Sequence, residues 1–159
     1  MKKILSVLSI SLMLSVSAFA QSNVVINSFA FVEKVKVENG KETKSLEKAT
    51  NVIPGETVIF KNIVENKNTT PAKDIVVNNQ IPKEISFNNA FSSDEKNTQY
   101  EYSVDGVTFN KSDKLMIKDK ETGNMRNARP EEYTHIRWIY TQGIPSQSKI
   151  EFNYKGVLK

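Results

Sequence analysis

Apolar and polar residues alternate through most of the chain after residue 23, which is the period of a β-strand with one buried face. The clearest alternation lies in segments 136–140 and 150–154 near the end of the sequence. No window of helical length carries apolar residues at spacings of three and four. Several short strands separated by turn residues predict an all-β fold, an immunoglobulin-like antiparallel β-sandwich.

Turn residues divide this pattern into elements. Asn39–Gly40 is the favoured pair for a two-residue hairpin, because both central residues must reach positive φ. Residues 41–49 are expected to return as the partner strand, although 44–48 fit one helical turn equally well. Asp105–Gly106 gives a second hairpin signal. The remaining expected elements are a strand over 24–37, strands near 58–64, 75–77, 100–104, 107–109 and 115–117, and a long polar loop over 118–132.

Residues in phase on the best strands predict the core between the two sheets. Trp138 is the largest apolar side chain available and should lie at the centre of the sandwich. The expected core residues are Trp138, Ile136, Tyr140, Val58, Phe60, Ile75, Val77 and Phe152. Asn62 is in phase with them, and an unpartnered buried amide would cost about 1–3 kcal/mol. Either Asn62 is hydrogen-bonded, or a bulge shifts the register and turns Ile63 inward.

Residues 1–20 have the pattern of a cleavable export leader. Lys2 and Lys3 give a positive start, a short apolar stretch follows, and Ala18–Phe19–Ala20 supplies the small residues that a signal peptidase requires. The apolar stretch is too short to cross a bilayer comfortably, and no basic stop-transfer flank follows it. We therefore expect cleavage before Gln21, export to the periplasm or beyond, and no membrane span afterwards.

Composition narrows the class of the mature chain, residues 21–159, which has the length of one domain. The sequence has no Cys, so an oxidising compartment adds no disulfide. Without its leader lysines the chain has 20 Lys and Arg against 18 Asp and Glu, with the two signs interspersed. Such a pattern is typical of solvated strand faces, and no nucleic-acid partner is expected.

Catalysis is not expected from this sequence. His135 is the single histidine, and the sequence offers no Cys and no nucleophile elbow to accompany it. One His without Cys does not build a standard zinc site. Asp119, Glu121 and Asn124 place oxygen ligands around Gly123, but in the wrong order for an EF-hand calcium loop. We therefore predict a non-enzymatic protein without a cofactor.

Three blocks of the sequence resemble the bacterial extracellular repeat catalogued as domain of unknown function 11. The family shows a Pro-Gly turn, an alternating strand ending in Asn, a turn with a small residue, a valine-rich strand and a Leu-Pro stop. The matching residues here are Pro54, Gly55, Val58, Phe60, Asn62, Val64, Asn66, Ala72, Ile75, Val76, Val77, Asn79, Ile81 and Pro82. Residues 134–158 are similar to its closing hairpin, and Asp105–Gly106 to its Tyr-Ser-x-Asp-Gly element.

The resemblance implies an immunoglobulin-like fold and a place in surface proteins, where family members commonly occur as tandem repeats. This chain carries a single copy. Asn79 stands where the family commonly has Asp, and Asn62 where it usually has an aliphatic residue. Both departures make a metal site at the strand ends less expected.

Two classes of function follow. The first is an exported structural or adhesion module whose partners are other envelope or surface proteins. Its predicted interaction face is the outward stripe of Tyr133, His135, Arg137 and Ile139, since Tyr and Arg anchor protein interfaces when desolvated. The second is a periplasmic protein that binds a small ligand or calcium, with residues 118–132 as the lid.

Overall fold

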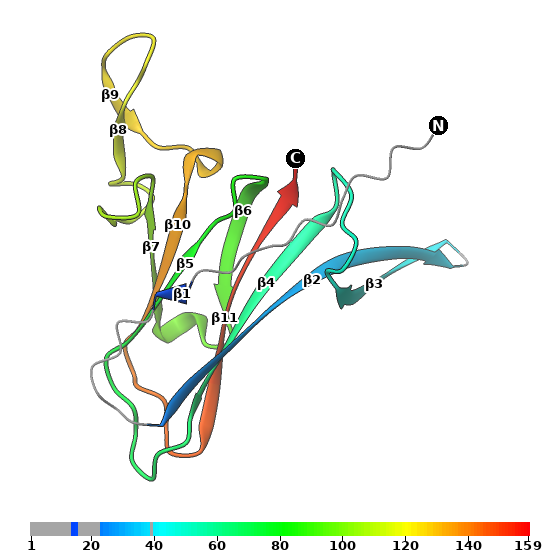
Figure 1. The fold of residues 1–159 in the computed structure, drawn as a ribbon, viewed down its shortest axis with the longest axis vertical. Coiled ribbons are helices and arrows are strands. Elements are labelled where there is room, and N and C mark those ends of the chain that lie inside the picture. Colours follow the sequence, from blue (N-terminus) through cyan, green and yellow to red (C-terminus); the bar gives the residue numbers. More distant parts are fainter. Residues whose placement is uncertain (1–13, 16–22, 39) are drawn as a thin grey trace.

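Two antiparallel β-sheets face each other in the computed structural model, which describes residues 14–15, 23–38 and 40–159 (Figure 1). The fold is an all-β, immunoglobulin-like sandwich, as the sequence predicted. Its elements are β1 (Leu14–Ser15), β2 (Val24–Glu38), β3 (Lys41–Lys48), β4 (Thr57–Asn66), β5 (Ile75–Gln80), β6 (Ile85–Ser92), the 3-10 turn η1 (Glu95–Asn97), β7 (Thr98–Ser103), β8 (Met116–Lys118), β9 (Met125–Asn127), the 3-10 turn η2 (Pro130–Glu132), β10 (His135–Tyr140) and β11 (Ser148–Leu158).

Sheet A has the strand order β1-β5-β10-β7, and sheet B has the order β3-β2-β4-β11-β6. A separate two-stranded sheet, β8-β9, projects beyond the end of sheet A (Figure 1). Within the part of the chain that the structure describes, no helix is long and apolar enough to span a membrane. Of the expected leader, the structure describes only β1, which pairs with Asn78 and Asn79 of β5.

Large side chains from the two inner faces meet between the sheets. Trp138, from the middle of β10, lies 6.1 Å from Phe152 of β11 between ring centroids, and Phe60 stacks on Tyr154 at 4.5 Å. All eight residues expected in the core are buried, because strand alternation places them on the inner faces. Burial of aromatic side chains of this size is the main apolar contribution to stability.

The buried amide of Asn62 is hydrogen-bonded, which settles the two alternatives left open by the sequence. Its Oδ1 accepts hydrogen bonds from the Ser28 hydroxyl (2.7 Å) and from Nδ2 of Asn79 (3.2 Å), and its Nδ2 donates to the Phe152 carbonyl (3.1 Å). The register of β4 with both neighbours is unbroken at this point. Asn62 of sheet B and Asn79 of sheet A therefore link the two layers through the core.

Three local expectations are wrong. Residues 118–132 are not an irregular loop, because they contain β9 and η2 and close a hairpin onto β8. Residues 107–109 form no strand; the Asp105 carboxylate accepts hydrogen bonds from the backbone N–H groups of Val107 and Thr108, and only Asn110 bridges back, to Tyr102. β6 lies just after Ile81–Pro82, in a stretch where the sequence predicted no strand.

The hairpin of β2 and β3 extends beyond the sandwich. β2 pairs with β4 only as far as Val32, whereas its pairing with β3 continues to Glu38 and Lys41. We call residues 33–46 the arm; Asn39 within it lies outside the described residues. Figure 1 shows the arm leaving the body of the protein with no other strand over it. The alternative of a helical turn at 44–48 is excluded, because these residues belong to β3.

Candidate functional site

The outer face of sheet A carries most of the interaction stripe that the sequence predicted. His135, Arg137 and Ile139 lie on β10 and are half-buried, facing away from Trp138. Tyr133 does not belong to this face: it is buried, with its ring 4.6 Å from that of Tyr102 between centroids. It precedes β10 at the end of η2, where the chain turns, so strand alternation does not extend back to it.

Arg137 is held from three directions. Its Nε donates to Oδ1 of Asn78 (2.8 Å) on β5, and its Nη1 donates to Oε2 of Glu101 (3.3 Å) on β7. The register explains this row, because Asn78 and Glu101 are the cross-strand neighbours of Arg137 on either side. The guanidinium carbon also lies 3.7 Å from the ring centroid of Phe109, a cation–π contact. These contacts fix the position of Arg137 on the outer face of sheet A.

His135 is enclosed by the loop that follows β7. Its Nδ1 lies 2.9 Å from the Thr134 hydroxyl, and its ring is 6.3 Å from that of Phe109 between centroids. Gly106 passes so close that a Cβ built on it would lie 2.7 Å from Cε1 of His135, and its φ of +76° is the left-handed value that favours glycine. The imidazole thus contacts a hydroxyl, an aromatic ring and backbone, and among the described residues no carboxylate forms a hydrogen bond with it.

Burial lowers the pKa of His135 below its ordinary value, and the nearby Asp105 opposes this shift less strongly. A histidine with a lowered pKa in the folded state binds fewer protons there than in the unfolded chain. Its contribution to stability is therefore present above pH 6.5 and is lost as the pH falls through the folded pKa.

We expect the free energy of unfolding to fall from pH 7.5 to pH 5.5, because the lowered pKa of His135 makes the folded state bind fewer protons than the unfolded chain. His135 is the single histidine of the sequence, so the effect is assigned to one residue. Denaturant melts at the two pH values measure this difference. The variant H135Q should lose most of it. An equal fall in H135Q would show that another group is responsible.

The β8–β9 hairpin contains the acidic residues considered for calcium. Oδ1 of Asp119 accepts hydrogen bonds from the backbone N–H groups of Glu121 (3.1 Å) and Thr122 (2.9 Å), and its Oδ2 accepts one from Nε of Arg126 (2.8 Å). Arg126 and these backbone donors lower the pKa of Asp119. Among the described residues, no three His, Cys, Asp or Glu side chains gather closely enough to hold a metal ion. The Asp119 carboxylate is thus already engaged by donors from the protein.

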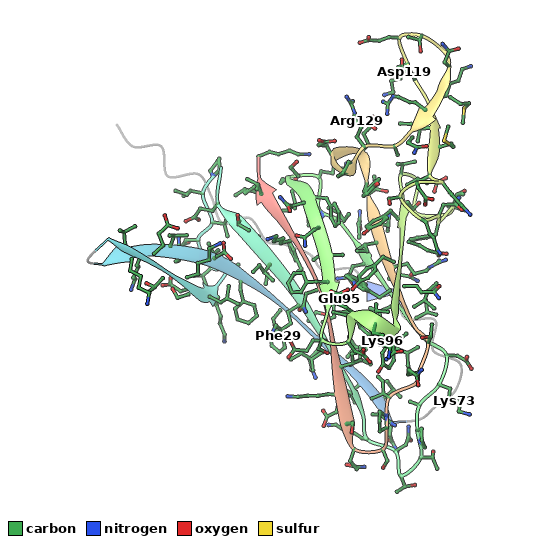
Figure 2. The ribbon with its side chains drawn as sticks, turned by 180° about the vertical axis from the view of Figure 1, so that it is seen from behind. Phe29, Lys73, Glu95, Lys96, Asp119 and Arg129 are labelled. Atoms are coloured by element: carbon green, nitrogen blue, oxygen red, sulfur yellow. The ribbon has the colours of Figure 1, made fainter. Side chains whose placement is uncertain are left out.

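Arg126 joins this hairpin to η2. Its Nη1 and Nη2 donate to the two carboxylate oxygens of Glu132, at 2.8 and 2.7 Å. This bidentate pair, with the backbone N–H of Arg129, lowers the pKa of Glu132 to about 2. Figure 2 shows Asp119 at the far end of the hairpin and Arg129 near its base. The network fixes the hairpin where it projects from the sandwich.

The arm is the exposed feature that the sequence did not identify as a functional site. Val35, Val37 and Leu46 are 51%, 65% and 49% exposed, although they are large apolar side chains. Because Leu46 lies opposite Glu33 in the hairpin, all three share one face. Phe29 and Phe31 continue this face onto the outer side of sheet B, with ring centroids 6.3 Å apart.

Among the described residues, the side-chain hydrogen bonds and ion pairs of the arm are few. Lys34 pairs with Glu56 at its base, and Lys44 pairs with Glu33 at 3.0 Å across the two strands. Every residue of β3 is exposed. The composition of Lys41–Lys48, with Leu46 as its one large apolar residue, was the available signal that this strand has no buried face.

No protein-family model, curated protein or solved structure matches this chain.

Proposed function

We propose that this chain is an exported, non-enzymatic interaction module of the bacterial cell envelope, with a structural or adhesive role. The observation that carries the proposal is the arm. A two-stranded ribbon is marginally stable in water, so a surface docked on the apolar face of the arm would add to its stability. Its apolar side chains, rimmed by Lys and Glu, have the composition of a docking surface.

Other features support the same role. The leader expected over residues 1–20 supports export, and the resemblance to the extracellular repeat supports a place among surface proteins. The surroundings of His135 support a non-enzymatic role, because its neighbours are a hydroxyl, an aromatic ring and backbone. The face of His135, Arg137 and Ile139 stays a predicted secondary contact, since Arg137 is already engaged by its own sheet.

Lysine substitutions on the arm test this proposal. In the variant V35K/V37K/L46K, three charges replace the exposed apolar side chains, and we expect retention in the envelope fraction to fall about tenfold. The measurement is the ratio of envelope-bound to soluble protein after fractionation of producing cells. Thermal unfolding checks that the sandwich is intact.

The matched control is I53K/V107K/M125K, which adds the same charge at three exposed apolar residues outside the arm. Its retention should equal that of the unmodified chain. Equal retention of the arm variant and the control would contradict a docking role for the arm. An unprocessed chain that stays in the cytoplasm would contradict export.

A further inference from the structure

We propose that the arm binds a second copy of this chain, through antiparallel pairing of the two β3 strands about a two-fold axis at Ser45. This inference rests on the proposed function, because it names the partner of the same arm. It follows from three properties of β3: where its free backbone groups point, which registers a two-fold axis permits, and which of these registers opposes unlike charges.

The first property is a row of free backbone groups along the outer edge of β3. The N–H of Ala49 donates to the carbonyl of Ala30, so this residue turns its backbone toward β2. Backbone groups alternate in direction along a strand, and the register of β2 with β3 is unbroken from Lys48 to Lys41. Glu42, Lys44, Leu46 and Lys48 therefore turn their N–H and C=O groups away from β2, toward the open edge. The Lys48 carbonyl accepts a hydrogen bond from the Thr50 N–H (2.8 Å), so at this residue the free group is the N–H.

The second property is symmetry. Two identical antiparallel strands are related by an axis perpendicular to the sheet, and such an axis keeps each face of the sheet on the same side. Directly opposed residues have their side chains on the same face, so an even-numbered residue must lie opposite an even-numbered one and an odd-numbered residue opposite an odd-numbered one. The two-fold axis therefore passes through a residue of β3 and not between two residues. An axis through any residue from Thr43 to Leu46 keeps most of the strand paired.

The third property is charge, because the possible registers differ in which charged side chains they place opposite each other. An axis at Lys44 places its ammonium group against its own copy, and an axis at Leu46 places Lys44 against Lys48 of the second copy. Like charges directly opposite each other destabilise a sheet. An axis at Thr43 pairs only residues 41–45.

An axis at Ser45 pairs the whole stretch from Glu42 to Lys48. It sets Glu42 opposite Lys48 of the second copy, twice by symmetry, and Lys44 opposite Leu46. Lys44 already has a partner in Glu33 on its own chain. This register therefore contains two favourable ion pairs and no direct clash of charge. Charged residues commonly protect an edge strand from pairing; here they select one register.

The same register extends the apolar face of the arm. Glu42, Lys44, Leu46 and Lys48 lie on the face that carries Val35 and Val37, so the two copies of Leu46 come to lie diagonally across the axis. Val35 of each copy lies in the same cross-strand row as its own Lys44 and the other copy's Leu46. Figure 2 shows the side chains of the arm projecting away from the two facing sheets. Pairing would join the two copies of sheet B into one continuous sheet.

Charge reversal tests the register. The variants E42K and K48E each oppose like charges twice in the dimer, so the dimer dissociation constant should rise about tenfold. The double variant E42K/K48E restores opposite charges and should recover the original constant. Sedimentation equilibrium of the exported chain over a concentration series measures all four proteins. Neither residue has an ion pair among the described residues, so the fold should be unaffected.

Cysteine cross-linking gives an independent test, helped by the absence of native Cys. In S45C the two thiols meet on the axis, where opposed Cα atoms lie about 4.5–5.5 Å apart, within disulfide reach. In the control T43C the two thiols lie about 13 Å apart along the strands. Under mild oxidation S45C should form disulfide-linked dimer at least about tenfold faster than T43C, since only its thiols are held together.

Equal cross-linking of S45C and T43C would overturn the inference, as would a monomer at every concentration. So would an unchanged dissociation constant in E42K and K48E. One of these results could occur while retention of V35K/V37K/L46K in the envelope fraction is still reduced. In that case the interaction role of the arm stands and its partner is another protein. Loss of dimer and of retention in the same arm variant supports both proposals together.

Discussion

The variant G156A is expected to lower the free energy of unfolding by about 3 kcal/mol, the upper part of the usual range for overpacking a core. A Cβ on Gly156 would lie 2.4 Å from Cγ2 of Ile85 and 2.5 Å from the carbonyl oxygen of Ser86. The second contact is with backbone and cannot be relieved by a rotamer change. Gly156 also follows the register shift between β11 and β6, so the strands are already irregular there. Urea unfolding at neutral pH measures the effect.

G123A is the control for this experiment. Gly123 has a φ of +73°, and a Cβ added there would meet Cε of Lys118 at 3.9 Å, an ordinary van der Waals contact. That variant should lose only about 1–2 kcal/mol, the cost of the left-handed conformation for alanine. If G156A were as stable as the unmodified chain, β6 and β11 could not approach each other as closely at Gly156 as the structure shows.

The second large effect concerns the amide pair in the core. In N62L the amide of Asn79, the Ser28 hydroxyl and the Phe152 carbonyl each lose a hydrogen bond. Unsatisfied buried groups cost about 1–3 kcal/mol each, so we expect a loss of about 3 kcal/mol overall. N79L alone should also destabilise the protein, because it removes the hydrogen bond that Asn79 donates to Asn62. The double variant N62L/N79L removes both amides and should be more stable than N62L alone.

A double-mutant cycle checks this coupling through urea unfolding of the four proteins. We expect the loss in N62L/N79L to be smaller than the sum of the two single losses by about 1 kcal/mol or more, since the residues are in contact. Strict additivity would mean that the two amides do not interact across the sheets.

The sandwich could be predicted because period-two alternation is a direct consequence of strand geometry. β10 and β11 alternate cleanly, and Trp138 and Phe152 are buried as their phase requires. β6 was missed for a physical reason: inward and outward residues alternate only from Ile85 to Phe87, and the register shift opposite Gly156 breaks the pattern afterwards. A local sequence window does not contain the partner strand that causes this shift.

The candidate site was predicted less completely than the fold. The outward positions of His135, Arg137 and Ile139 follow from alternation, but Tyr133 lies before β10 and takes its direction from η2. The contact of Arg137 with Phe109 depends on a loop that folds back over the sheet. The arm was predicted as a hairpin but not as a projection. Its projection begins where β2 stops pairing with β4, at Val32, and the sequence of β2 alone does not show where this pairing ends.

The single tryptophan allows two events to be followed separately in one sample. Trp138 has no exposed surface, and its ring is 6.1 Å from that of Phe152 and 6.2 Å from that of Tyr154 between centroids. Its emission will shift to longer wavelength only when the two layers separate and water reaches the indole. Association through β3 leaves these neighbours unchanged, so it should be silent in tryptophan fluorescence. A light-scattering change at constant emission would therefore report assembly of intact molecules.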